Sequence, residues 1–190
     1  MSAPLKQDRK TEIVAAASEL IQRYGYDSFS YKDLSTKLGI TKAGIHHHFP
    51  SKEDLGLAVC EAAREGFHQF FNGLAQIDGF WSMMEELRKE GLEMVNTGRI
   101  CPITALQADD NSITEAMRNQ MALVSNEEFE YWEKQIRKAA DANEIVFKGD
   151  AADVAVLFVG VLKGVMMLAK EGGGERHNQV FSILKQQFST

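Results

Sequence analysis

Cysteine is nearly absent from this chain, and its scarcity excludes two kinds of small domain. The 190 residues include only Cys60 and Cys101. Two thiols so far apart in sequence indicate neither a disulfide framework nor a zinc site made of thiolates. We expect both to stay reduced in a cytosolic protein. Cys60, which lies among Leu57, Ala58 and Val59, is expected to serve packing.

Long apolar runs are also missing. The longest, residues 154–162, is interrupted at Lys163, and the N-terminus is polar and charged over residues 6–10. A membrane-spanning helix needs about 20 apolar residues, and a secretory signal needs an apolar segment after its basic residues. The sequence therefore predicts a soluble, cytoplasmic protein without a membrane segment.

Signatures of catalysis are absent as well. The sequence has no glycine-rich phosphate loop, no Gly-x-Ser-x-Gly elbow, no His-Glu-x-x-His pair and no evident cysteine–histidine pairing. His46, His47 and His48 are consecutive, so on a helix their side chains point about 100° apart and cannot converge on one metal ion. We expect no enzyme activity, no metal site and no cofactor.

An excess of positive charge is missing from the chain as a whole, whose formal net charge is -6. The charge is nevertheless unevenly distributed. Residues 1–52 hold eight Lys and Arg against five Asp and Glu, a net charge of +3, whereas the remainder holds 13 against 22, a net charge of -9. A mildly basic head on an acidic body is the pattern expected of a DNA-binding domain joined to a regulatory domain.

What the sequence does contain is helical patterning. With 44% hydrophobic residues it can bury a sizeable core, and no alternation of apolar and polar residues is long enough to indicate a sheet. We predict an all-α fold, with a three-helix helix-turn-helix domain over residues 1–52 and a helical regulatory, ligand-binding and dimerisation domain over residues 53–190. Turn residues separate the helices expected after the motif, which cover residues 51–76, 80–97, 102–108, 112–143, 149–171 and 175–188.

The most specific pattern lies in residues 30–55. Ser30 with Asp33 forms a capping signature for a short helix, which Gly39 can end in a left-handed conformation. Thr41 can then cap a second short helix. The Ser-x-x-Asp signature recurs at Ser51 and Asp54 and opens a long helix, so the segment predicts a helix-turn-helix that leads into a connecting helix.

This order of elements resembles the DNA-binding domain of TetR-type bacterial repressors. The resemblance covers about the first third of the chain and is carried most clearly by the run Phe49, Pro50, Ser51, Lys52, Glu53 and Leu55. It implies that a shift in the body moves the reading head through the connecting helix. The chain departs from the family pattern at His46, where most members carry a tyrosine that contacts the DNA backbone.

The candidate DNA contacts are the residues at the start of the second motif helix and the lysine that opens the third helix: Thr41, Lys42, Ala43, Gly44, His46, His47 and Lys52. We expect Lys42 and the two small residues after it to approach base edges, and the others to hold phosphates. Lys52 follows a cap at a helix N-terminus, where free backbone N–H groups favour an anion.

Residues 150–170 are apolar on nearly every side, which predicts two buried faces. The segment is either an internal core helix or part of a two-fold dimer interface with the last helix. We predict the dimer, because Gly160 and Gly164 permit close helix approach and two heads could address half-sites about 34 Å apart. The candidate interface residues are Gly160, Val161, Gly164, Val180 and Leu184.

Cys101 lies directly before Pro102, so its thiol is expected near a helix N-terminus, where the pKa of a thiol falls. The surrounding Gly-x-x-Cys-Pro segment also resembles a stretch found in one branch of TetR-type regulators, some of which respond to reactive compounds. Cys101 is therefore a candidate electrophile or redox sensor, and apolar packing is the alternative.

Methionine and aromatic side chains on the body helices predict an apolar ligand pocket. Methionines suit varied ligands but also fill cores, so both roles stay open. Trp132 and Phe129, three apart on one helix face, are the main candidates, with a core or dimer role as the alternative. The candidate ligand contacts are Cys101, Met84, Met121, Phe129, Trp132 and Phe158.

Together these observations favour a dimeric, ligand-responsive DNA-binding repressor. It would bind a palindromic operator and be released by a small apolar or electrophilic effector. Two other hypotheses remain: a non-catalytic all-α protein that sequesters small molecules and no longer reads DNA, and, ranked last, an enzyme that uses Cys101 as a nucleophile.

Overall fold

The computed structural model describes residues 8–109 and 111–190. Within these ranges the chain is helical without strands, apart from an isolated antiparallel bridge between Ile145 and Ser189. The predicted all-α fold is confirmed. In chain order the helices are α1 (Arg9–Tyr24), α2 (Tyr31–Leu38), α3 (Lys42–His48), α4 (Lys52–Leu74), α5 (Phe80–Asn96), α6 (Pro102–Ala108), α7 (Glu115–Asp141), α8 (Ala151–Gly172) and α9 (Gly174–Phe188).

The first helices form as their local sequence predicts. The Ser30 N–H donates to Asp33 Oδ2 at 2.8 Å and completes the capping box that begins α2. Gly39 takes the left-handed conformation, with φ 63°, and ends α2. Thr41 Oγ1 then accepts a hydrogen bond from the Gly44 N–H at the start of α3. The helix-turn-helix is thus built from contacts between near neighbours in sequence.

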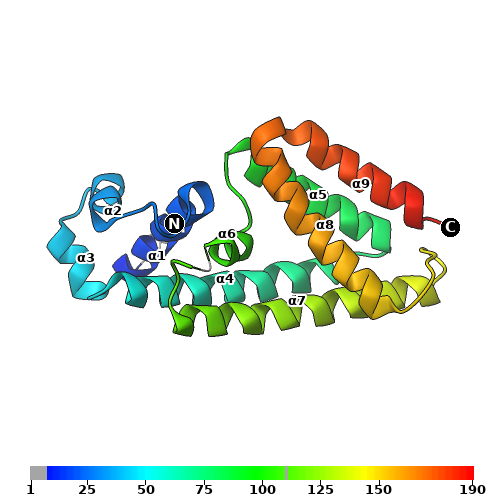
Figure 1. The fold of residues 1–190 in the computed structure, drawn as a ribbon, viewed down its shortest axis with the longest axis horizontal. Coiled ribbons are helices and arrows are strands. Elements are labelled where there is room, and N and C mark those ends of the chain that lie inside the picture. Colours follow the sequence, from blue (N-terminus) through cyan, green and yellow to red (C-terminus); the bar gives the residue numbers. More distant parts are fainter. Residues whose placement is uncertain (1–7, 110) are drawn as a thin grey trace, which may run out of the picture.

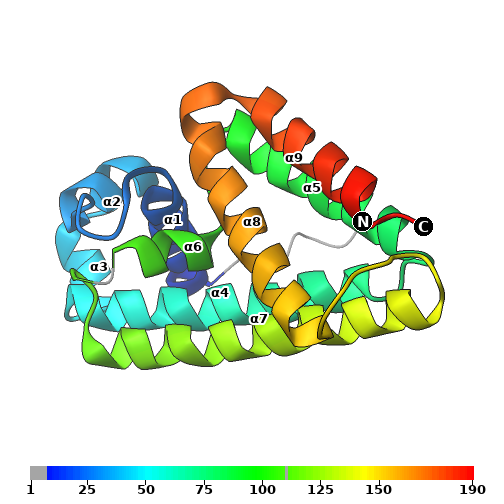
Figure 2. The same cartoon turned by 45° about the vertical axis from the view of Figure 1, so that its right-hand side comes forward.

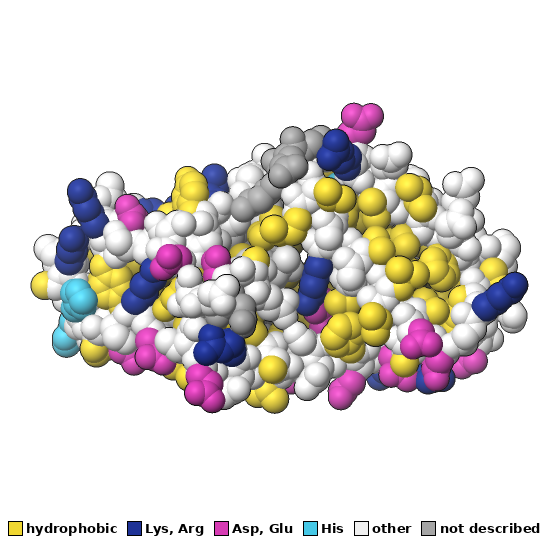
Figure 3. All heavy atoms as spheres, in the orientation of Figure 1, with side chains coloured by type: hydrophobic (Ala, Val, Ile, Leu, Met, Phe, Trp, Pro, Cys, Tyr) yellow, Lys and Arg dark blue, Asp and Glu magenta, His cyan; other side chains and the backbone are white. Residues whose placement is uncertain are grey.

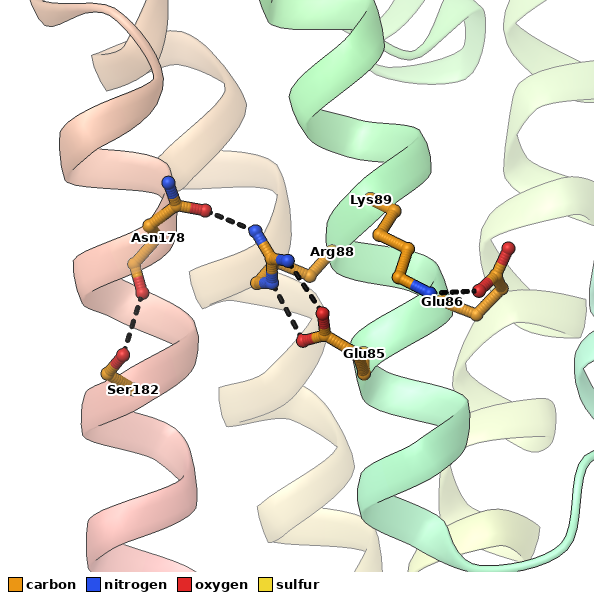
Figure 4. A network of polar contacts seen from close by, with 6 residues as sticks. All are labelled: Glu85, Glu86, Arg88, Lys89, Asn178 and Ser182. Carbon is orange, nitrogen blue, oxygen red and sulfur yellow. Dashed lines mark hydrogen bonds and ion pairs between the residues drawn. The ribbon is translucent and has the colours of Figure 1, made fainter.

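In the body, α4 and α7 lie side by side, and the remaining long helices pack over this pair (Figures 1 and 2). α8 packs on α7 and α9, and α5 packs on α9. Arg88 of α5 pairs with Glu85 and donates to Asn178 Oδ1 of α9, which ties these two helices together (Figure 4). The body helices begin and end within three residues of the predicted positions.

Two hydrophobic cores hold the helices together. The first joins α1–α3 to α4, α6 and α7 and includes Ile13, Leu106 and Met117. The second lies among α5, α7, α8 and α9 around Trp132 and Phe158. Because the first core runs from the N-terminal helices into the body, the helix-turn-helix packs directly against the helices that follow it. The predicted division after residue 52 stays a prediction.

α8 is strongly apolar. By length and composition its residues Ala151–Ala169 could cross a membrane, with a mean hydropathy of 2.0, and 39% of this window is buried. In the sequence, Lys163 interrupts the apolar run of this helix. In the structure, the Lys163 amine is paired with Glu128 inside the body. Val156 and Leu157 remain exposed, so one face of α8 is apolar and uncovered.

Candidate nucleic-acid interface and ligand cavity

α3 presents its first half to solvent at one end of the molecule, where Figure 3 shows cationic and imidazole side chains. Ile45 is fully buried and anchors the helix, while Gly44 is half-buried beside the Thr41 cap. Across the described ranges, no group of three His, Cys, Asp or Glu side chains is arranged to hold a metal ion. The predicted DNA contacts that are exposed here are Thr41, Lys42, Ala43, His46 and His47.

Tyr31, which sequence reasoning missed, ties α2 to the turn after α3. Its hydroxyl lies 2.9 Å from the carbonyl oxygen of Phe49 and 2.5 Å from that of Ser51, and its ring centroid lies 4.6 Å from that of His46. Burial raises the pKa of Tyr31 to about 12, so the hydroxyl stays protonated and donates. Its partners are backbone carbonyl groups, which every residue has, so the sequence does not indicate this contact.

Lys52 departs from the geometry expected of a phosphate contact. Its Nζ atom lies 4.7 Å from the ring centroids of both Tyr26 and Phe29 and donates to the carbonyl oxygen of Asp27 at 3.3 Å. Burial lowers the pKa of Lys52, while Asp27 and Asp109 act against this shift. The amine is held against the α1–α2 turn because two aromatic rings there favour a cation. A phosphate contact would require the side chain to move, and that role stays a prediction.

A cavity of about 490 Å³ lies between the N-terminal helices and the body. One wall is α1, which contributes Thr11, Val14, Ala15 and Ser18, and residues of α4 to α9 form the others. The lining is mostly apolar, as in sites that bind small organic molecules. A molecule in this cavity would contact the helix-turn-helix domain and the body at the same time.

Two of the predicted ligand contacts, Cys101 and Trp132, line this cavity. The other four do not line it, and they pack in or against the hydrophobic cores, to which Trp132 also belongs. Spacing along one helix predicts an apolar face but not which neighbouring helix that face meets. The four predicted residues outside the cavity lining are Met84, Met121, Phe129 and Phe158.

Cys101 lies at a helix N-terminus, as its position before Pro102 predicts, but the expected fall in its pKa is wrong. Burial raises the pKa of the Cys101 thiol, and the charge of Glu128 acts in the same direction. Backbone N–H groups of Thr104 and Ile103 favour the thiolate without overcoming the effect of burial. The thiol is therefore protonated, which makes it a weak nucleophile.

The polar part of the lining was not predicted. Lys163 Nζ of α8 lies 2.7 Å from Glu128 Oε2 of α7 and donates to Gln107 Oε1 at 2.8 Å. Gln107 Nε2 in turn donates to Ser125 Oγ at 2.6 Å. Burial raises the pKa of Glu128, and Lys163 opposes this. Glu127 and Glu128 look alike in sequence, and only the packing of α7 on α8 shows that Glu128 faces inward.

α6 connects the cavity to the N-terminal domain. Its first turn lines the cavity, and Asp109 at its C-terminal end meets the turn after α1. Asp109 Oδ2 accepts a hydrogen bond from the Tyr26 N–H at 2.5 Å, and the Ile100 N–H donates to the Gln22 carbonyl at 3.4 Å. Gly25 permits this approach, because a Cβ there would lie 2.7 Å from Asp109 Oδ2. One short helix therefore touches both the cavity and the motif domain.

Residues 13–59, which include α2, α3 and most of α1, match the family model described as bacterial regulatory proteins, tetR family. The chain carries the TetR-family DNA-binding domain at its N-terminal end. It is a TetR-type transcriptional regulator, and the resemblance drawn from the residues around the helix-turn-helix is confirmed. The fold agrees over the whole chain: a TetR family transcriptional regulator from Agrobacterium tumefaciens has a TM-score of 0.90 at 23% identity, covering 97% of this chain and 99% of that chain.

Two sequence relatives match more of the chain than residues 13–59. The nucleoid occlusion factor SlmA of Marinobacter nauticus is 28% identical over 145 residues, which is 74% of this chain and 70% of the relative. The HTH-type transcriptional repressor KstR2 of Rhodococcus jostii is 29% identical over 129 residues, which is 66% of this chain and 57% of the relative. The chain thus matches little more than half the length of the second relative.

The residues predicted for a TetR-type dimer interface lie in different environments. Gly160 is exposed and Gly164 is half-buried, and nothing lies within 4 Å of a Cβ built on either. Val161 and Val180 are half-buried beside the second core. Leu184 is only 5% exposed and belongs to that core, so its side chain is already covered within the monomer. The role of these residues in a dimer interface stays a prediction.

Proposed function

We propose that this TetR-type regulator is a repressor that binds a palindromic operator as a homodimer and leaves it when a small molecule occupies the cavity. The observation that carries this proposal is the double role of α1, which belongs to the helix-turn-helix domain and forms one wall of the cavity. A molecule that reshapes the cavity displaces α1, and with it α3. By linkage, the effector must bind the DNA-incompetent arrangement more tightly.

The exposed start of α3 supports operator reading. Ala43 and Gly44 leave room for the helix to approach base edges, and Lys42 supplies a cation beside them. His46 and His47, which are exposed one turn further along the helix, are the residues that we expect to contact phosphates. Two such heads, related by a two-fold axis, would recognise two equal half-sites, which is why the operator is expected to be palindromic.

The uncovered apolar face of α8 and α9 supports the homodimer. Val156, Leu157 and Met167 of α8 and Ile183 of α9 are each at least 45% exposed. Figure 3 shows hydrophobic side chains gathered over these two helices. An apolar surface of this kind marks an interface, and a second copy would cover it with the same surface. Such a dimer accounts for the apolar face of α8 without a membrane, so we infer a cytoplasmic protein.

The cavity favours an apolar effector over an electrophilic one. The Cys101 thiol is protonated because burial raises its pKa, and a protonated thiol adds slowly to electrophiles. The two charged side chains beside it, Glu128 and Lys163, are paired with each other. We infer reversible binding at this site, with neither catalysis nor a cofactor.

The test is to select bound DNA from a random duplex pool and to titrate the enriched sequence at two salt concentrations. We expect a palindrome whose affinity falls steeply with salt. Lys42→Ala should weaken binding about 10-fold or more. Lys148→Ala, which removes an exposed lysine of the body, is the matched control and should change little. A folded dimer that enriches no sequence would contradict the proposal and favour a sequestering protein.

A further inference from the structure

We propose that the cavity takes a lipophilic monocation, meaning an apolar molecule with one quaternary or protonated amine whose charge pairs with Glu128. The proposal deepens the function proposed above, because it rests on the cavity being the effector site. It is argued from the charges that line the cavity, from the partners those charges already have, and from the rings around them.

The charged groups in the lining do not balance. They are the exposed Glu90 of α5 and the paired Glu128 of α7 and Lys163 of α8, which together carry a formal net charge of -1. The remaining titratable base, His177 of α9, stays neutral because burial lowers its pKa and Arg88 adds to the shift. A single positive charge on the ligand would bring the lining to neutrality, whereas an anion would double the imbalance.

Existing partners make Lys163 unsuitable as an anion site. Its ammonium group already has two acceptors, Glu128 Oε2 at 2.7 Å and Gln107 Oε1 at 2.8 Å. A ligand carboxylate would compete with both of these oxygens. It would also lie beside the Glu128 carboxylate, and like charges at such short range are unfavourable in a poorly hydrated cavity.

Glu128, unlike Lys163, can take a further partner, because its carboxylate can accept more hydrogen bonds than it receives. Its side chain is 13% exposed, and its one ion-pair partner among the described residues is Lys163. Its Oε2 atom is buried and forms the ion pair with Lys163 Nζ, but that contact does not have the geometry of a hydrogen bond. An ionised carboxylate can accept about four hydrogen bonds, so a cation or donor in the cavity would relieve a real deficit.

Aromatic rings in the lining suit the rest of such a molecule. They lie on three of the helices around the cavity, where they can cover an apolar body and place ring faces toward a cation. The net charge of -9 on residues 53–190 would also raise the local concentration of cations near the opening. The rings that line the cavity are Phe67, Phe70, Phe71, Trp132 and Phe181.

The test uses three probes built on 6-hydroxynaphthalene that carry, at position 2, a trimethylammonium, a tert-butyl or a carboxylate group. The first two have the same shape and differ in charge alone. Binding to the full chain is measured by calorimetry at pH 7 without DNA. We expect the cation to bind about 10-fold more tightly than its neutral isostere, and the anion to bind most weakly.

The matched variants are Glu128→Gln and Glu130→Gln, which change neighbouring carboxyl groups of α7, the second of them exposed to solvent. Glu128→Gln should weaken the cation about 10-fold and leave the neutral probe within about twofold, while Glu130→Gln should change neither. Equal or tighter binding of the neutral probe to the unmodified chain would overturn the proposal, whatever the variants do.

Operator release separates this proposal from the function on which it rests. If the cation binds selectively but does not release DNA, the ligand class holds and the effector role fails. If the neutral or anionic probe binds best and releases DNA, the repressor role holds and the ligand class is wrong.

Discussion

The contact between Asp109 and the turn after α1 should be measurable as a contribution to stability. Tyr26 is only 4% exposed, so its N–H has no water to replace the Asp109 carboxylate when that acceptor is removed. A hydrogen bond to a charged group contributes about 1.5–3 kcal/mol, and a buried donor left without a partner costs about as much. We therefore expect Asp109→Ala to lower the free energy of unfolding by about 2 kcal/mol.

Asp109→Asn should cost about half as much, because the amide oxygen can still accept from the Tyr26 N–H without the charge. The assay is urea unfolding at pH 7, followed by fluorescence and by circular dichroism. Asp78→Ala removes an exposed aspartate from the turn before α5 and serves as the control. A loss below about 0.5 kcal/mol for Asp109→Ala, or one equal to the control, would refute the reasoning.

A second substitution makes the same test sharper. Gly25→Ala places a Cβ 2.7 Å from Asp109 Oδ2 and strains a backbone with φ 88°. In the Asp109→Ala background the steric part of that cost disappears while the backbone strain remains. The two substitutions should therefore be less than additive, as expected of residues in direct contact. Additive costs would mean that the two groups do not touch.

Three further outcomes follow from other parts of the structure. Leu157→Glu should convert a dimer into a monomer in analytical ultracentrifugation, whereas Val146→Glu, at an exposed position before α8, should not. Burial and Arg88 lower the pKa of His177 in the folded state, so the unfolded state binds its proton first as pH falls. The contribution of His177 to the free energy of unfolding is complete above pH 6.5, its ordinary pKa, and is lost as the pH falls from there toward the folded-state pKa. The free energy of unfolding of His177→Gln should therefore fall less steeply with decreasing pH than that of the unmodified chain. Gly91→Ala would place a Cβ 2.6 Å from His177 Nε2 and should lower the unfolding free energy by about 1–3 kcal/mol in the same assay.

The features that sequence predicted well are those set by near neighbours. The capping boxes at Ser30 and Ser51, the left-handed Gly39 and the Thr41 cap each involve residues within a few positions of one another, and each forms as expected. Helix boundaries follow from such signals. The same signals, read with the run from Phe49 to Leu55, also led to the family.

The features that sequence missed depend on which helices meet in space. Leu184, which is predicted for the dimer interface, packs in the second core, and Glu128, which looks like Glu127 in sequence, lines the cavity. Cys101 has the helix position expected of a reactive thiol, but burial by distant residues outweighs that position. Lys52 has a phosphate-binding position, but its amine rests on Tyr26 and Phe29. In each case a non-local contact sets the surroundings of the side chain, and the predicted roles of Leu184 and Lys52 stay predictions.

Because α1 forms one wall of the cavity, an exchange of the helix-turn-helix domain also changes the cavity. Exchanging helix-turn-helix domains between related regulators is a direct way to redirect them to new operators. Here such an exchange would also replace Thr11, Val14, Ala15 and Ser18, and so rebuild one side of the small-molecule site. A chimera that keeps the host body should therefore change its chemical selectivity along with its DNA target, unless these four positions are carried over from the host.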